Sequence, residues 1–127
     1  MNSKCQIALA LLTGASIGAA AIQGLHAQAK PKAYIITESE LIDAGALAAY
    51  QPKAQAAVRA AGGTPGFISS GKVIAAVGDP PKRFGASEWP SAEQAQAYLK
   101  SSERAALDTE RAKAFKTTRQ FIVERPN

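Results

Sequence analysis

The side chains that could do chemistry in this chain are a carboxylate, several guanidiniums and a set of aromatic rings. Glu88 lies in the run 82–89, which alternates like a strand and places Glu88 on the same face as Phe84. A carboxylate buried on such a face needs a cationic partner, or else its pKa rises and it becomes a candidate acid or base. Arg83 and Arg111 are the partners considered, although strand alternation points Arg83 to the opposite face. Glu88 is therefore either part of a structural ion pair or the candidate catalytic carboxylate.

Large amphipathic rings are the second group of candidates, because each combines an apolar body with a polar edge. In a small protein such rings lie in the core or at a subunit interface, or else they line a ligand pocket. The ligand-pocket candidates are four rings and three charged residues: Tyr34, Glu38, Tyr50, Arg83, Trp89, Tyr98 and Arg111.

The first 29 residues have the features of a secretory signal peptide. A polar start with one cation, Lys4, precedes an uncharged run of apolar and small residues over 7–22, and a small-x-small tripeptide ends at Ala29. The apolar run is shorter than the roughly 20 residues that a membrane-spanning helix needs. We therefore expect cleavage after Ala29, no stable membrane span afterwards, and a location in the periplasm or outside the cell.

Cleavage would restrict the chemistry, because the chain's one cysteine (Cys5) and one histidine (His26) both lie in the removed segment. Thiol catalysis and histidine-dependent triads would then be excluded. Carboxylates are the metal ligands that remain. Their close cluster near residue 40 is better explained as a strand end and a helix cap than as a site for a hard cation. We expect neither a metal nor a cofactor.

The mature chain, 127 less 29 residues, is 98 residues long and forms one domain over 30–127. A domain of this size without disulfides has a modest core, and a homodimer would bury more surface. Removal of Lys4 from the 15 basic residues leaves 14 against 10 acidic ones, a net charge of +4. Acidic residues interrupt the basic ones after Lys100, so nucleic acid is not an expected partner. A small anionic ligand or an anionic membrane surface remains possible.

Periodicity predicts alternating strands and helices along the mature chain. Asp43 can cap a helix over 43–61 that Gly62 ends, and Pro52 should kink or divide that helix. Ser91 can cap a second helix. The other predicted elements are strands over 33–38, 66–69, 73–77, 82–89 and 120–124, a hairpin turn at Ser70-Gly71, and a helical stretch over 103–113. This order suits an α+β sandwich with helices on one face of an antiparallel sheet. Two such sheets meeting face to face would cover the remaining face.

The run Arg83–Ser91 (RFGASEWPS) resembles the strand-to-helix signature of the family called domain of unknown function 1330. Further matches in order include Tyr34, Tyr50, the Gly62-Gly63 pair and a Ser-x-Glu link ending at Glu103. The resemblance spans roughly 33–124. It implies a ferredoxin-like βαββαβ fold that pairs as a dimeric α+β barrel, and it implies no established activity.

Three positions depart from that family's pattern. Ser70 stands where a basic residue often precedes the hairpin glycine, and Arg104 stands where a tyrosine usually follows the Ser-x-Glu step. The strand residues 85–87, Gly-Ala-Ser, are smaller than the usual aliphatic ones. A pocket in this protein should therefore be lined by smaller and more polar groups than is typical.

Three classes of function remain open at this stage. We favour an exported homodimeric domain that binds a small organic or anionic molecule or has a structural role. The alternative is a cofactor-free enzyme acting on a small organic substrate, monooxygenase- or isomerase-like, by analogy of fold alone. The third is a module that binds a partner protein.

Overall fold

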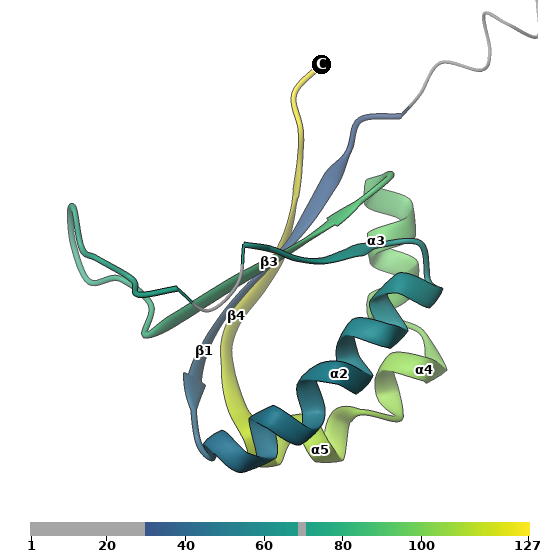
Figure 1. The fold of residues 1–127 in the computed structure, drawn as a ribbon. Helices are drawn as coiled ribbons and strands as arrows, with labels where there is room; N and C mark the ends of the chain where they lie inside the picture. The colour runs from purple at the N-terminus through teal and green to yellow at the C-terminus, as the bar shows by residue number, and fades with distance from the viewer. Residues whose placement is uncertain (1–29, 69–70) are drawn as a thin grey trace, which may run out of the picture. The chain divides into compact units, whose positions relative to one another are not determined.

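The computed structural model describes residues 30–68 and 71–127, and residues 31–127 form one compact unit (Figure 1). The predicted signal peptide, and Ser70 of the predicted turn, lie outside the described residues. The elements in chain order are β1 (Ala33–Leu41), α2 (Ala44–Ala60), β2 (Thr64–Ile68), β3 (Arg83–Trp89), α3 (Ala92–Leu99), α4 (Ser102–Ala105), α5 (Asp108–Ala114) and β4 (Phe115–Glu124).

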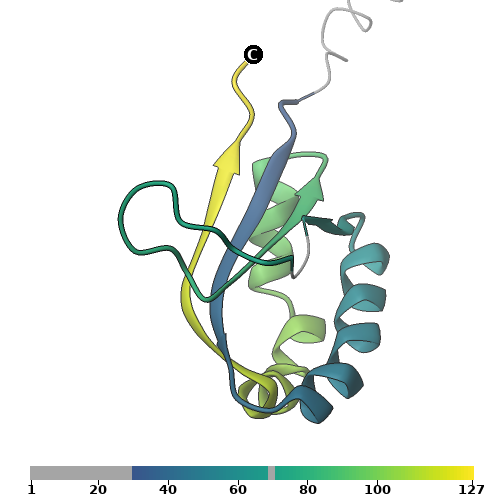
Figure 2. The ribbon, with the colours of Figure 1, turned by 60° about the vertical axis from the view of Figure 1, so that its left-hand side comes forward.

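The four strands form one sheet in the order β2-β3-β1-β4, and every pairing is antiparallel. The helices lie together on one side of this sheet (Figures 1 and 2). The predicted α+β class is therefore confirmed, and the strand order is that of the ferredoxin-like arrangement. The sheet of a single chain is open, because β2 and β4 are edge strands and do not close into a barrel.

Alternation along the strands assigns each residue to one of two faces. Ile35 pairs with Ser87 on β3 and with Ile122 on β4, on the face that the helices cover. Ile36 pairs with Ala86 and Phe121 on the opposite face, which we call the open face. The predicted division of β1 and β3 into two faces agrees with this register.

The first helix begins and ends where the sequence indicates, but it is not divided. The Asp43 side chain accepts a hydrogen bond from the Ala46 backbone N–H at 2.6 Å, and Gly62 follows the helix with a φ of 93°. Pro52 lies inside a continuous helix of 17 residues, so the expected division is wrong. Pro52 and Ala48 are both exposed, and the Ala48 carbonyl that loses its helical donor can therefore bond to water.

The connection between β2 and β3 differs from the predicted hairpin. The structure has no strand over 73–77, although Val73 to Val77 is apolar, and β2 begins at Thr64 rather than at residue 66. Ile74 and Val77 are 76% and 97% exposed. The reason is that the 71–82 segment extends away from the helix layer, where it has no neighbouring strand to pair with (Figures 1 and 2).

Elements in the second half follow the prediction with shifted ends. Ser91 caps α3 by accepting a hydrogen bond from the Gln94 N–H at 3.2 Å. The predicted single helix over 103–113 is divided into α4 and α5 around Ala106 and Leu107. The last strand begins at Phe115, five residues before the predicted start.

Trp89 is the centre of the core between the helices and the sheet. It is 1% exposed, its ring stacks on Tyr98 with a centroid distance of 4.9 Å, and its Nε1 donates to Ser87 Oγ at 2.8 Å. The other buried residues of the cluster around Trp89 and Tyr98 are Ile35, Val58 and Ala95. Gly63 lies against the indole, and a Cβ at this position would be 2.8 Å from three ring carbons.

Within the described part of the chain, no helix combines the length and the apolar character that crossing a membrane requires.

Candidate functional site

A pocket of about 220 Å³ lies between α2, the α4–α5 region and the covered face of the sheet. Its apolar lining includes Ile35, Leu47, Val58, Leu99 and Phe115. Four of the seven predicted pocket residues line it: Tyr50, Arg83, Tyr98 and Arg111. The pocket is therefore the place where the structure brings sequence-predicted site residues together.

Two cross-strand rows form the polar part of the pocket floor. In the first row Ser39 of β1 pairs with Arg83 on one side and with Thr117 on the other. In the second row Thr37 pairs with Gly85 and with Gln120. Since neighbouring strands are about 4.8 Å apart, these rows place polar side chains across three strands at one end of the pocket.

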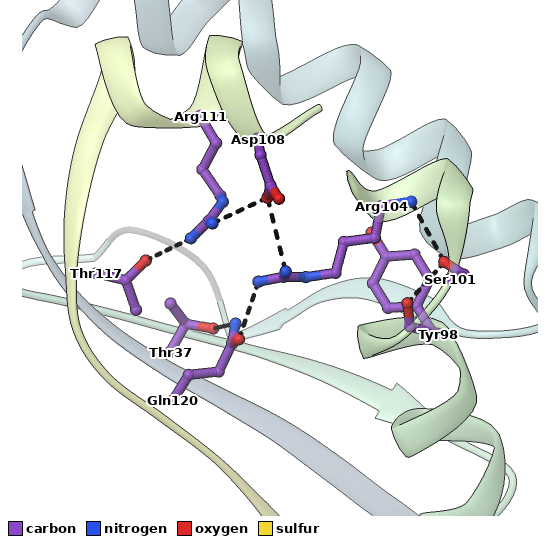
Figure 3. A network of polar contacts seen from close by, with 8 residues as sticks. All are labelled: Thr37, Tyr98, Ser101, Arg104, Asp108, Arg111, Thr117 and Gln120. Atoms are coloured by element: carbon purple, nitrogen blue, oxygen red, sulfur yellow. Dashed lines mark hydrogen bonds and ion pairs between the residues drawn. The ribbon is translucent and has the colours of Figure 1, made fainter. Parts of the chain in front are cut away.

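Arg104 and Arg111 are fixed above this floor by a network of polar contacts (Figure 3). Arg111 donates to Asp108 Oδ1 at 2.9 Å and to Thr117 Oγ1 at 3.0 Å. Arg104 donates to Gln120 Oε1 at 3.0 Å and lies 3.7 Å from Asp108 Oδ1. Asp108 is thus shared between two guanidiniums, so the network carries more positive than negative charge.

Several donors at the pocket have no acceptor. Arg111 Nε is buried and has no hydrogen-bond partner. Arg83 is half-buried and, among the described residues, forms neither a hydrogen bond nor an ion pair through its side chain. The hydroxyls of Tyr50 and Tyr98 also lack a partner within the described ranges. Of these groups only Arg111 Nε is a fully buried atom, where bonding is nearly always found; the Arg83 guanidinium and the two hydroxyls are accessible from the pocket and are therefore free to bond to a ligand that enters it.

The two phenols are held in their protonated form. Burial raises the pKa of Tyr50, with the nearby Tyr98 adding to the rise and the Arg111 and Arg104 guanidiniums opposing it. Burial likewise raises the pKa of Tyr98 against the opposing effect of the same two guanidiniums. At neutral pH both hydroxyls are therefore available as hydrogen-bond donors.

The other three predicted pocket residues lie elsewhere. Trp89 belongs to the core and stacks on Tyr98 without lining the pocket. Tyr34 and Glu38 are on the open face, where the Tyr34 ring contacts Phe67 and Glu38 accepts two hydrogen bonds from Arg119, at 2.7 and 3.0 Å.

Glu88, the candidate catalytic carboxylate, is also on the open face. It accepts hydrogen bonds from Lys32 Nζ at 2.9 Å and from the Tyr34 hydroxyl at 3.2 Å. The Lys32 hydrogen bond is the main cause that lowers the pKa of Glu88. Its cationic partner is Lys32, not Arg83 or Arg111, and the shift is opposite to the rise that a general acid near neutral pH would need.

The sequence analysis did not assign Arg104, Thr37, Thr117 or Gln120 to the pocket. The sequence contains a cue for Arg104, since this residue replaces a tyrosine in the pattern of the family that the chain resembles. The sequence contains no such cue for Thr37, Thr117 and Gln120. Their place in the pocket depends on a cross-strand register that includes a shift between Glu38 and Ser39.

The carboxylates near residue 40 form ion pairs or a helix cap within the protein. Glu38 pairs with Arg119, Glu40 lies 3.4 Å from Lys82, and Asp43 caps α2. Among the residues that the structure describes, no group of three potential ligands could hold a metal ion.

The fold and the pocket together define a small α+β domain with a ligand-sized cavity beneath its helices. The chain belongs to the family described as Domain of unknown function (DUF1330), whose model matches residues 32–125. No curated protein matches the chain.

Solved structures are similar in fold. One is the crystal structure of a protein of unknown function from Rhodopseudomonas palustris, with 14% identity and a TM-score of 0.60, covering 84% of this chain and 91% of that one. The methylated form of the same protein gives a TM-score of 0.58 at 14% identity, covering 84% and 89%. At this identity the likeness concerns the fold alone.

Proposed function

We propose that this protein is an exported, homodimeric domain that binds a small molecule in the pocket beneath α2. The observation that supports the proposal most strongly is the convergence of unused donors on one cavity. Tyr50, Tyr98 and Arg83 line a space of about 220 Å³, and none of their side chains has a hydrogen-bond acceptor among the described residues. A ligand that supplies acceptors would satisfy them.

The composition of the pocket favours binding over acid–base catalysis. Of the described residues, no aspartate or glutamate lines it, and the raised pKa values of Tyr50 and Tyr98 keep both phenols protonated at neutral pH, so neither is available as a general base. The alternative of a cofactor-free monooxygenase- or isomerase-like enzyme therefore has no carboxylate base at this site to act on a substrate.

Substitution of Gly85 tests the pocket with little disturbance of the fold. A Cβ at Gly85 would meet Ile68 O at 3.8 Å, an ordinary contact distance, and valine suits a strand. We expect Gly85→Val to fill part of the pocket floor and to abolish the melting-temperature shifts that members of a small-metabolite set cause in the wild type. Thr118→Val, an exposed strand position outside the pocket, is the matched control and should keep them. Shifts that persist in Gly85→Val would contradict binding in this pocket.

The open face supports the homodimer. It exposes Phe121 and Val123 of the edge strand β4 at 42% and 45%, beside Ile36 and Tyr34 of β1, and exposed neighbouring apolar side chains of this kind mark interaction surfaces. Its charges are already matched, since Glu38 pairs with Arg119 and Glu88 with Lys32. A second copy would therefore meet exposed apolar side chains along β4 beside charges that are already neutralised, without net repulsion across a two-fold interface.

Sedimentation velocity tests this interface. Phe121→Asp would place a charge among the exposed apolar side chains of the open face, and we expect the variant to sediment as a monomer at concentrations where the wild type is a dimer. Ile42→Asp, at an exposed apolar position in the β1–α2 connection, should stay dimeric. Dimers that survive Phe121→Asp would contradict the open face as the interface.

Export is tested by the mass of the protein recovered from outside the cytoplasm. The proposal requires a mature chain that begins at Lys30. An intact N-terminus would contradict cleavage and would retain Cys5 and His26.

A further inference from the structure

We infer that the molecule bound in this pocket is an organic carboxylate whose body is about the size of one six-membered ring. This inference rests on the proposed small-molecule binding and assigns the ligand's chemical class. It is drawn from the charge of the pocket, from the kind of hydrogen bond that its lining leaves unused, and from its size.

The charge of the pocket is positive. Arg83, Arg104 and Arg111 all line it, and Asp108 is the one carboxylate among the described residues that pairs with any of them. One negative charge set against three positive ones leaves an excess of two. Guanidinium groups match the planar geometry of a carboxylate, and a single ligand carboxylate would offset half of the excess.

Among the charged and phenolic groups of the lining, those without a partner in the described structure are donors, while Ser39, Gln51 and Gln55, which also line the pocket, can both donate and accept. A guanidinium has no acceptor, so Arg83 offers hydrogen bonds and accepts none. The pKa values of Tyr50 and Tyr98 are raised by burial, so their hydroxyls keep the proton that they can donate. A carboxylate has two oxygens that accept and none that donates when ionised, which is the complement of this set.

The rest of the pocket is suited to an apolar body. Ile35, Leu47, Val58 and Phe115 form its walls, and Gly85 leaves the floor without a side chain. An apolar cavity of about 150 Å³ holds a benzene molecule, so about 220 Å³ accommodates a single ring or a short aliphatic chain together with a carboxylate.

The experiment compares acids with their neutral amides. Benzoate and hexanoate are titrated into the purified protein by calorimetry, and benzamide and hexanamide are titrated under the same conditions. We expect each acid to bind at least about tenfold more tightly than its amide, because one charge-assisted hydrogen bond in a partly buried site is worth that factor or more.

Arg83→Gln is the variant of choice, because within the described residues the Arg83 side chain forms no hydrogen bond or ion pair that the substitution would break. We expect it to weaken benzoate binding about tenfold and to leave benzamide binding unchanged. Arg59→Gln, an exposed position at the end of α2 outside the pocket, makes the same change in net charge and should have no effect.

The possible failures separate the two proposals. If benzamide binds as well as benzoate, or if Arg83→Gln leaves benzoate affinity unchanged, the carboxylate inference is wrong, while loss of both ligands in Gly85→Val still supports binding in the pocket. Phenyl phosphate binding more tightly than benzoate would overturn the carboxylate in favour of a phosphate ester. If neither acid binds, the inference fails. If, in addition, no metabolite shifts the melting temperature in a Gly85-dependent way, the proposed function fails with it.

Discussion

In the pocket between the helices and the covered face of the sheet, Arg83 and two tyrosine hydroxyls have no acceptor within the described residues, whereas on the open face the carboxylates Glu38, Glu40 and Glu88 each have a cationic partner. The apolar residues show the opposite contrast. Trp89 on the covered face is 1% exposed, and Phe121 on the open face is 42% exposed. Both faces are formed by alternate residues of the same strands.

The difference indicates two kinds of binding surface. Unused donors around a cavity are suited to a small ligand with acceptors, because the ligand can supply the hydrogen bonds that the protein itself does not. Matched charges around exposed apolar residues are suited to a protein surface, because burial of the apolar part is favourable and the charges are already compensated. Four experiments with substituted proteins can break or sharpen this contrast.

The largest effect is expected at Trp89. Trp89→Ala would remove the stacked indole from the core and leave Ser87 Oγ without its donor, and we expect the free energy of unfolding to fall by about 3–5 kcal/mol. Phe121→Ala on the open face should cost about 1 kcal/mol or less in dilute protein. Urea denaturation measures both, and similar losses at the two positions would contradict the assignment of the core to the covered face.

Gly63→Ala should have the next largest effect. The new Cβ would lie 2.8 Å from three carbons of the Trp89 ring, which cannot yield because it is packed between the glycine and Tyr98. We expect a loss of about 1–3 kcal/mol from overpacking. Gly85→Ala is the matched control, since its Cβ has a nearest neighbour at 3.8 Å, and its urea denaturation midpoint should stay close to that of the wild type.

Substitution of one arginine on each face compares how the charges of the two faces affect stability. Arg83→Gln removes a half-buried charge without a partner in the described structure, and we expect unfolding free energy to be unchanged or higher by up to about 1 kcal/mol, as is common for binding residues. Arg119→Gln breaks the exposed pair with Glu38 and should lower stability slightly. A clear loss of stability in Arg83→Gln would show that Arg83 has a structural role.

The smallest effect is a pH dependence at Glu88. Its pKa is lowered in the folded state, first by the Lys32 hydrogen bond. A lowered pKa contributes stability that is present above the unfolded pKa of about 4.3 and is lost as pH falls through the folded value. Thermal unfolding between about pH 6 and pH 3 should therefore show a shallower decline for Glu88→Gln than for the wild type. Parallel curves would mean that the Lys32 pair contributes nothing measurable.

Local features of the fold could be predicted from the sequence because their causes are local. The alternation in 33–38 and 83–89 identified the two faces, and Asp43 and Ser91 identified the starts of two helices, since each cap bonds to a backbone N–H three residues away. The 73–77 segment was misassigned because an apolar, β-branched run becomes a strand only where another strand is available to pair with it.

Part of the pocket could also be predicted from residue types. Tyr50 and Tyr98 were selected as rings with polar edges and Arg83 and Arg111 as possible partners of Glu88, and the structure places all four in the lining. Glu88 was selected as a carboxylate on an apolar strand face, but its partner Lys32 is 56 positions away in the chain. The sequence did not indicate which cation would reach it.

The sequence by itself determined the α+β class, the helix caps and the composition of the two sheet faces, because those depend on periodicity and on contacts within a few residues. The tertiary structure alone decided that Arg104 and Gln120 join the pocket, that Asp108 is shared by two guanidiniums, and that Arg83 has no partner among the described residues. These properties depend on the register of strands and on helices that are distant in sequence. A displacement of less than an ångström decides whether a hydrogen bond forms, and a pattern of residue types does not specify distances that finely.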